Sequence, residues 1–134
     1  MEEVEKAYLA GIVDGEGTVT LSKHHKNETP TPRVIVANTN LELLRWIKAR
    51  VGGVITSKRK YKICHRDSYA WAVCQNRAIC FLNDIKQFLI IKKKQADLIT
   101  RDYKKVTNRA GRYTPEMLSK KYQLVNKIRK LNQR

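Results

Sequence analysis

Two acidic residues, Asp14 and Glu16, alternate with glycines where an apolar helical segment gives way to a strand-like one. The C-terminal end of a helix has unpaired carbonyl groups and a partial negative charge, so a carboxylate there has the wrong sign. A bound divalent cation would resolve this conflict, because carbonyl and carboxylate oxygens are ligands for hard metals. The stretch LAGIVDGEGTVTLS, residues 9–22, is therefore a candidate metal site.

Three lysines, Lys92, Lys93 and Lys94, create the opposite conflict at the predicted start of a later helix. The N-terminal end of a helix has a partial positive charge, which disfavours lysine and favours an anion. An anion bound there would relieve the three lysines. The alternative is a solvated run of charge, which fits Lys93 and Lys94 because they point elsewhere around the helix.

Charge narrows the class of partner. The chain has 134 residues, of which 42% are hydrophobic, enough for one domain with a modest core. Its formal net charge is +16, and the basic residues are spread over the whole sequence. This distribution favours a broad nucleic-acid-binding surface over a detachable basic tail. A merely soluble basic protein, or one that binds an anionic membrane surface, is the alternative.

Location and redox state follow from the same sequence. No apolar run is long enough to span a membrane, and the N-terminal MEEVEK lacks the apolar region of a signal peptide. We therefore expect an intracellular protein, cytoplasmic or, in a eukaryotic host, organellar, with no membrane partner. The cysteines, Cys64, Cys74 and Cys80, show no C-x-x-C spacing, which predicts buried free thiols rather than disulfides or a zinc site.

Hydrophobic periodicity predicts an α+β chain in which helices alternate with pairs of strands. Helices are predicted over residues 3–13, from a Thr39–Glu42 capping box to Gly52, over 76–108 with a division near Leu89, and over 114–131. Strands are predicted over residues 18–25, 33–37, 54–63 and 68–74. The order is therefore α-ββ-α-ββ-α-α with a final α, in which two hairpins form one sheet and the helices cover its other face.

The strands carry polar and basic side chains on one face. A two-stranded ribbon of this kind fits the major groove of B-DNA, where lysine and arginine can pair with guanine and serine or threonine with either base. The residues expected to contact DNA are Thr18, Thr20, Ser22, His24, Lys26, Arg33, Lys58, Lys60 and Lys62. Trp71 is expected in the core, and the basic residues of the last helix, Lys120, Lys121, Lys127 and Arg129, are expected to meet phosphates or water.

Residues 9–17, LAGIVDGEG, resemble the motif that names the LAGLIDADG homing endonucleases, with conservative changes at Ile12-Val13 and in the acidic turn. Residues 34–40 with Leu43-Leu44, residues 88–96 and Leu131-Asn132 resemble later parts of the same family. The resemblance implies one LAGLIDADG endonuclease domain over residues 1–134. It also implies the α-ββ-α-ββ-α fold, with an antiparallel DNA-binding sheet and extra C-terminal helices.

The resemblance also implies an active site. It makes Glu16 a direct ligand of Mg²⁺, for which Mn²⁺ would substitute, with the carbonyl of Gly15 beside it. Lys92 matches the active-site lysine of the family, and Asn38 falls where a glutamine often positions solvent, although Asn38 has a structural alternative near the next helix cap. For Asp14 we favour a turn carboxylate that accepts backbone N–H bonds over direct metal ligation.

A single copy of the motif resembles the homodimeric members of the family. The resemblance then implies a two-fold dimer in which residues 3–13 cross the partner helix, with Ala7, Ala10, Gly11 and Asp14 at the interface. The implied activity is cleavage of both strands of a long pseudo-palindromic double-stranded DNA site, which leaves 3′ overhangs. The alternatives are a maturase that binds intron RNA and a DNA-binding relative that has lost catalysis.

Overall fold

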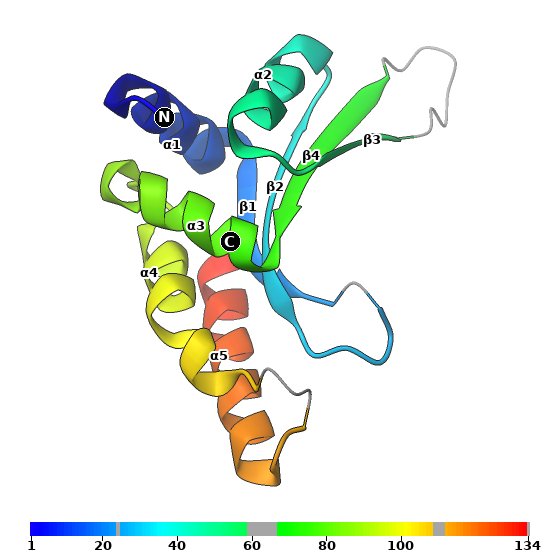
Figure 1. Ribbon diagram of the computed structural model, residues 1–134, viewed down its shortest axis with the longest axis vertical. Helices are drawn as coiled ribbons and strands as arrows, with labels where there is room; N and C mark the ends of the chain where they lie inside the picture. The colour runs from blue at the N-terminus through cyan, green and yellow to red at the C-terminus, as the bar shows by residue number, and fades with distance from the viewer. Residues whose placement is uncertain (24, 59–66, 109–111, 134) are drawn as a thin grey trace.

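The computed structural model describes residues 1–23, 25–58, 67–108 and 112–133, and Figure 1 shows their arrangement. The helices are α1 (Glu3–Glu16), α2 (Leu41–Val51), α3 (Gln75–Ile85), α4 (Lys93–Asp102) and α5 (Pro115–Asn132). The strands are β1 (Gly17–Ser22), β2 (Thr31–Asn38), β3 (Val54–Lys58) and β4 (Ser68–Cys74). Short 3-10 helices, η1 (Lys86–Phe88) and η2 (Lys104–Val106), follow α3 and α4.

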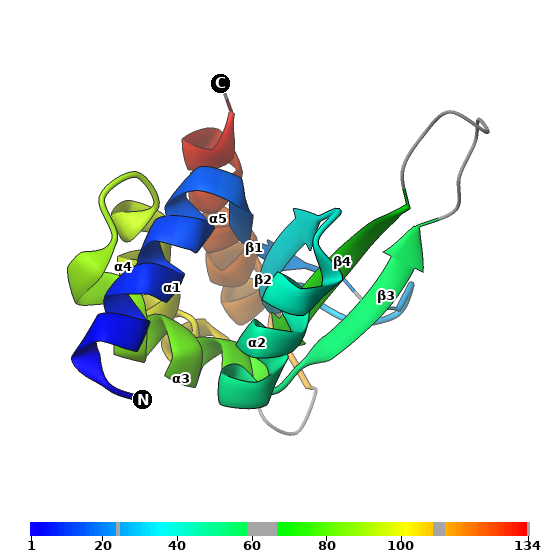
Figure 2. The ribbon, with the colours of Figure 1, turned by 90° about the horizontal axis from the view of Figure 1, so that it is seen from above.

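The four strands form one antiparallel sheet in the order β1-β2-β4-β3, which confirms the predicted α+β fold. Helices pack on one face of this sheet, with α1 and α3 against β2, α5 against β1 and α2 beside β4 (Figure 2). Alternate strand residues supply the core on that face, among them Val19, Val34, Trp71 and Val73. The Trp71 indole N–H donates to the Gly52 carbonyl at 2.7 Å, so its polar edge is satisfied in the core as well.

In the part of the chain that the structure describes, no helix covers the opposite face of the sheet, and the composition of this face follows from the strand register. Thr18 pairs with Ile35, and Thr20 pairs with Arg33, so the predicted alternation along β1 is confirmed. The open-face side chains that are described are Thr18, Thr20 and Ser22 of β1, Thr31, Arg33, Ile35 and Ala37 of β2, Val54 and Thr56 of β3, and Ser68, Ala70, Ala72 and Cys74 of β4. This face is polar where β1 and β2 meet and lined by small residues along β4.

Helix α1 differs from its prediction because it runs three residues beyond Val13, to Glu16. The acidic residues therefore lie in its last turn and not in a turn after it. Gly17 ends the helix while its N–H still bonds to the Val13 carbonyl. A Cβ on Gly17 would lie 2.9 Å from backbone atoms of Val13, so only glycine fits where helix and strand join.

The second helix begins one residue later than predicted. Asn40, not Thr39, is the N-cap, and its side-chain oxygen accepts the Leu43 N–H at 3.2 Å. Glu42 lies in the first turn as an acidic residue that favours the helix dipole, and the predicted capping box is wrong. The last helix agrees with its prediction, because Thr114 caps it through the Met117 N–H and Pro115 opens it.

The remaining differences concern lengths and thiols. The first strand ends at Ser22 instead of residue 25, while 68–74 has the predicted bounds. Cys74 is partly buried and Cys80 is exposed, so the free thiols are confirmed there but their full burial is wrong. Among the residues described, no helix is both long and apolar enough to cross a membrane.

Candidate active site and nucleic-acid interface

The carboxylate of Asp14 binds the start of a distant helix. Its oxygens accept the backbone N–H groups of Ile90 at 2.7 Å, Ile91 at 3.2 Å and Lys92 at 3.0 Å. These amides precede α4, whose first turn needs acceptors and favours negative charge. Asp14 therefore behaves as the carboxylate that accepts backbone N–H bonds, the alternative favoured from the sequence.

The side chain of Lys92 makes the reciprocal contact. Its ammonium donates to the backbone carbonyl of Asp14 at 2.7 Å, in the last turn of α1. That turn carries no basic residue of its own, so Lys92 supplies the cation that a helix C-terminus favours. The two unfavourable charges in the sequence thus compensate each other. The Asp14 carboxylate lies at the start of α4, and the Lys92 ammonium lies at the end of α1.

Glu16 takes no part in the contacts between Asp14 and the start of α4. Its side chain is exposed, and its Oε2 accepts the amide N–H of Asn38 at 2.6 Å. Asn38 ends β2, and its own oxygen accepts the Asn40 N–H at 2.8 Å, which fixes the orientation of its amide. The structure therefore brings Glu16 and Asn38 into contact and places Lys92 at the same end of α1, although the three are far apart in sequence.

The donors at this end of α1 suit a hard cation but do not complete a site within one chain. Glu16 offers a carboxylate and Gly15, exposed beside it, offers a carbonyl at a helix end; both are oxygen ligands of the kind that Mg²⁺ prefers. Within the described ranges of a single chain, no group of three His, Cys, Asp or Glu side chains could hold a metal. Further ligands would have to come from a second copy, from a phosphate or from water.

The predicted DNA-contacting residues gather on the open face of the sheet or near it. Thr18 is exposed, Thr20 and Ser22 are partly buried, and Lys26 is exposed in the connection between β1 and β2. Arg33 of β2 lies opposite Thr20 of β1. Lys58 is the last residue of β3, whereas His24, Lys60 and Lys62 lie outside the described residues.

Two polar atoms on this face have no partner among the described residues. They are the hydroxyl oxygen of Ser22 and the Nε of Arg33, both without exposed surface of their own. A buried polar group without a hydrogen bond is costly. An external ligand that reaches the face could satisfy both, and nucleic-acid bases carry the acceptors that arginine and serine need.

The outward face of α1 is apolar and includes the small residues Ala7 and Gly11. Val4 is 77% exposed and Tyr8 is 53% exposed, and Ala7 and Gly11 lie on the same face. Ala10 differs from its predicted place, because its side chain is fully buried in the core of its own chain. A Cβ on Gly11 or on Gly15 would meet nothing within 4 Å, so these two glycines do not serve packing within the chain.

Sequence reasoning missed two features. The small open-face residues of β4 had a signal, because Ser68, Ala70 and Ala72 alternate with large residues in SYAWAVC. The second is Lys121, which is fully buried and not at phosphates or water as predicted. The signal was its helical spacing, because Lys121 precedes Leu124, Val125 and Ile128 by three, four and seven residues and so shares their face of α5.

Comparison with known proteins agrees with this arrangement. The family model of the LAGLIDADG-like domain matches residues 3–105. The solved homing endonuclease I-CvuI, in complex with its target, has a TM-score of 0.80 at 21% identity, over 98% of this chain and 83% of that chain. The archaeal intron-encoded homing endonuclease I-Vdi141I, complexed with DNA, has a TM-score of 0.78 at 22% identity, over 100% and 87%.

A longer relative matches this chain only in part. The homing endonuclease I-SmaMI, bound to cleaved DNA, has a TM-score of 0.67 at 16% identity, over 96% of this chain but 45% of that one. No curated protein sequence matches. The helix with its acidic end and the four-stranded sheet thus define a LAGLIDADG endonuclease fold. The chain belongs to the LAGLIDADG-like family.

Proposed function

We propose that this chain is a site-specific homing endonuclease. As a homodimer it would cut both strands of a long, pseudo-palindromic double-stranded DNA site and leave 3′ overhangs. The observation that carries the proposal is Glu16, an exposed carboxylate held by Asn38 at the end of α1 where Lys92 also binds. The DNA complexes of I-CvuI and I-Vdi141I support the choice of substrate.

Different residues of the chain would bind the metal, position solvent and stabilise charge on the phosphate. Glu16 and the carbonyl of Gly15 would hold Mg²⁺, or Mn²⁺ in its place, and the bound ion would activate a water and stabilise the leaving oxygen. Asn38 keeps the Glu16 carboxylate in one orientation and would help to position solvent. The Lys92 ammonium, anchored to the Asp14 carbonyl, would stabilise negative charge that develops on the phosphate.

A second copy of the chain would complete the site. The exposed apolar residues Val4 and Tyr8, with Ile90 and Ile91 that are 85% and 69% exposed, leave one end of the molecule uncovered. Gly11 lies in the middle of the outward face of α1 with open space around it, so another backbone could approach closely there. A two-fold axis at this helix would bring two copies of Glu16 together. The partial match to the longer I-SmaMI chain supports a one-motif unit, for which residues 1–134 would be a single domain.

The decisive experiment is cleavage of a randomised duplex library with Mg²⁺. The controls are Ca²⁺ in place of Mg²⁺ and the variant Glu16→Gln, which keeps the side-chain shape and removes its charge. We expect recovery of one long, roughly palindromic site that only wild type cuts, and only with Mg²⁺, while Glu16→Gln still binds it. Binding without any cut would contradict nuclease activity and would make intron RNA, the ligand of a maturase, the next one to test.

Lys92→Ala tests the second catalytic role. Because the ammonium would act on charge that develops during the reaction, its loss should slow the single-turnover cleavage rate by about 10²-fold or more, with a much smaller effect on DNA affinity. Rapid-quench kinetics at saturating protein measure the rate, and a binding titration in Ca²⁺ measures the affinity. An unchanged rate would remove Lys92 from the proposed chemistry.

A further inference from the structure

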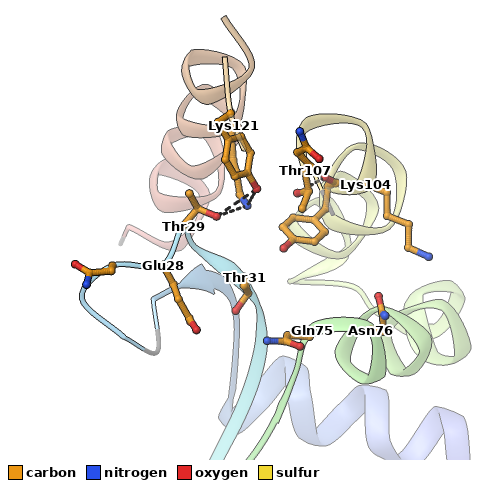
Figure 3. Close-up of a pocket in the computed structure, with 12 residues that line it drawn as sticks. Glu28, Thr29, Thr31, Gln75, Asn76, Lys104, Thr107 and Lys121 are labelled. Atoms are coloured by element: carbon orange, nitrogen blue, oxygen red, sulfur yellow. Dashed lines mark hydrogen bonds between the residues drawn. The ribbon is translucent and has the colours of Figure 1, made fainter. Parts of the chain in front are cut away.

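Lys121 is a fully buried lysine in the middle of α5, on the face that also buries Leu124 and Val125. Its ammonium donates to the Thr29 hydroxyl at 2.7 Å and to the Tyr113 hydroxyl at 2.9 Å (Figure 3). It also lies 5.0 and 5.1 Å from the ring centroids of Tyr103 and Tyr113. In the part of the chain that the structure describes, no carboxylate lies within ion-pair distance of it.

This arrangement is costly for a residue that only fills space. A buried charge loses its hydration, and hydrogen bonds and aromatic faces compensate for that loss only in part. A methionine would fill similar volume without this cost. The contacts of the ammonium therefore indicate what the residue is for.

The ammonium joins segments that nothing in the local sequence brings together. Thr29 lies in the connection between β1 and β2, 92 residues from Lys121, whereas Tyr113 lies two residues before α5 and Tyr103 caps the end of α4. A cavity of about 800 Å³ opens beside these groups, and residues of the connection, of α3 and of the C-terminal segments line it. The bond from Lys121 to Thr29 therefore attaches the connection to α5 at the edge of this cavity.

The hydrogen bonds of Lys121 to Thr29 and Tyr113 form a tie between α5 and the connection, and they also affect the pKa of Tyr113. Burial alone would raise its pKa, but the hydrogen bonds with Lys121 and Thr29 and the charge of Lys121 together hold its pKa below the usual 10.0. Since the ammonium has no acceptor role, each hydroxyl must accept its N–H. The tie is therefore directional and specific to a cation at position 121.

The connection that Lys121 contacts lies at the opposite end of β1 from the end of α1 that carries Glu16 (Figure 1). It carries the exposed Lys23 and Lys26. The six residues of β1, at about 3.3 Å each, separate it from Glu16 by about 20 Å. That distance corresponds to about six base pairs of B-DNA, so the connection would meet the outer part of a site that Glu16 cuts near its centre.

We propose that Lys121 is a positioning residue for DNA recognition, which fixes the β1–β2 connection so that Lys23 and Lys26 meet the outer base pairs of the target. Lys121 does not touch the DNA itself, because it has no exposed surface. The proposal rests on the proposed endonuclease function and adds a second determinant of specificity to the open face of the sheet.

The test is a base-by-base substitution scan of the recovered target with wild type, Lys121→Met and Thr29→Val, each as the full-length protein. Both variants break the tie, one from the helix and one from the connection, so Thr29→Val carries the test if Lys121→Met fails to fold. We expect both to lose about tenfold in preference at one or more outer positions and to weaken binding, with unchanged central positions and cleavage rate at saturating DNA. Lys121→Arg, which keeps the charge and its N–H donors, should restore part of the outer preference.

Gln123→Met, exposed on the same helix, is the matched control and should behave as wild type. Amide hydrogen exchange of the free protein adds a readout without DNA, because the amides of residues 25–29 should exchange faster in both variants. Wild-type preference at every position in the two variants would overturn the positioning role alone. If wild type neither binds nor cuts any duplex, the endonuclease function fails and the role falls with it, whatever the exchange shows.

Discussion

Asp14 and Glu16 are two residues apart, but their carboxylates have different hydrogen-bond partners. The Asp14 carboxylate is used within the chain, where it accepts three backbone N–H groups before α4. The Glu16 carboxylate has one side-chain donor, Asn38, and is otherwise turned to the surface. The Asp14 carboxylate therefore connects the two helix ends, which leaves the Glu16 carboxylate available for the proposed metal binding.

Stability should separate the two acids. Asp14→Asn removes a charged acceptor from three amides, so we expect the free energy of unfolding to fall by about 1–3 kcal/mol. Glu16→Gln should change it by less than about 0.5 kcal/mol, as is usual for an exposed residue. Urea unfolding of both variants at one pH measures the difference, and each variant adds the same net charge to a basic protein. An equal loss in both would mean that Glu16 is structural.

At the scale of elements, the N-terminal half of the molecule is held by a contact between α1 and α2. The guanidinium of Arg50 hydrogen-bonds to the Glu5 carboxylate and lies 3.9 Å from the centroid of the Trp46 ring. Tyr8 meets the same ring edge-on, with centroids 5.3 Å apart. The hydrogen bond from Arg50, with that from the Glu2 amide, lowers the pKa of Glu5 below its usual 4.5.

This contact predicts a defined pH dependence. Because the pKa of Glu5 is lower in the folded chain, its stabilising effect is complete above the unfolded value of 4.5 and is lost as the pH falls through the folded value. Glu5→Gln should therefore be less stable than wild type at neutral pH, and the gap should close in acid. Urea unfolding midpoints across the pH range measure this gap. Glu3→Gln, whose side chain is 70% exposed, is the control and should show little gap at any pH.

Most elements followed from local patterns, and the failures have physical causes. The strand 68–74 was predicted with its observed bounds. The end of α1 was predicted at Val13, which is wrong, because the helix continues until Gly17 meets the sheet. The sequence pattern showed that both helix ends carry charges of the unfavourable sign. The contact between Asp14 and Lys92 that compensates for them joins residues 78 positions apart and depends on tertiary packing.

Dependence on tertiary packing also explains why the predictions for Lys121 and Ala10 were wrong. Both were judged by residue type, Lys121 as a surface cation and Ala10 as a small residue for a helix crossing. Both side chains are buried, because each lies on the face of its helix that packs against the core. Open-face residues such as Arg33 were easier to predict, since the alternation of side chains along a strand determines which face of the sheet each residue lies on.

At the scale of the whole molecule, a net charge of +16 accompanies a sheet face that no helix covers among the described residues. In the proposed function, charge of this kind would supply affinity for phosphates, and residues on the open face would supply discrimination between bases. The two contributions should respond differently to salt and to mutation.

Lys120→Ala and Arg33→Ala should separate them. If Lys120, exposed on α5, neutralises a phosphate, its loss should reduce the slope of log affinity against log salt by about 0.9, with no change in base preference. Arg33→Ala should relax the preference at one base position, at a cost of about 1–3 kcal/mol. Binding titrations over a range of salt, on the target and on single-base variants, measure both. Base preference that is lost in Lys120→Ala and kept in Arg33→Ala would reverse the assignment.

The proposed dimer depends on the outward face of α1. Gly11→Arg should fold, because open space surrounds the position and arginine favours helix more than glycine does. Two arginines at the axis should nevertheless prevent close approach of the helices, so we expect a monomer that does not cut DNA. Sedimentation velocity measures the assembly. Ala49→Arg, exposed on α2, is the matched control, and dimers that persist in Gly11→Arg would place the interface elsewhere.

The two tryptophans of the chain lie in contrasting surroundings. Trp71 has no exposed surface and meets Phe81 edge-on in the core, whereas Trp46 is partly buried between α1 and α2, beneath Arg50. Emission from Trp71 should therefore shift only when the core opens. Emission from Trp46 should respond to any movement of α1, the helix that carries Glu16 and the proposed dimer face. The protein thus contains two intrinsic fluorophores, which can follow unfolding and rearrangement of that helix separately without an added dye.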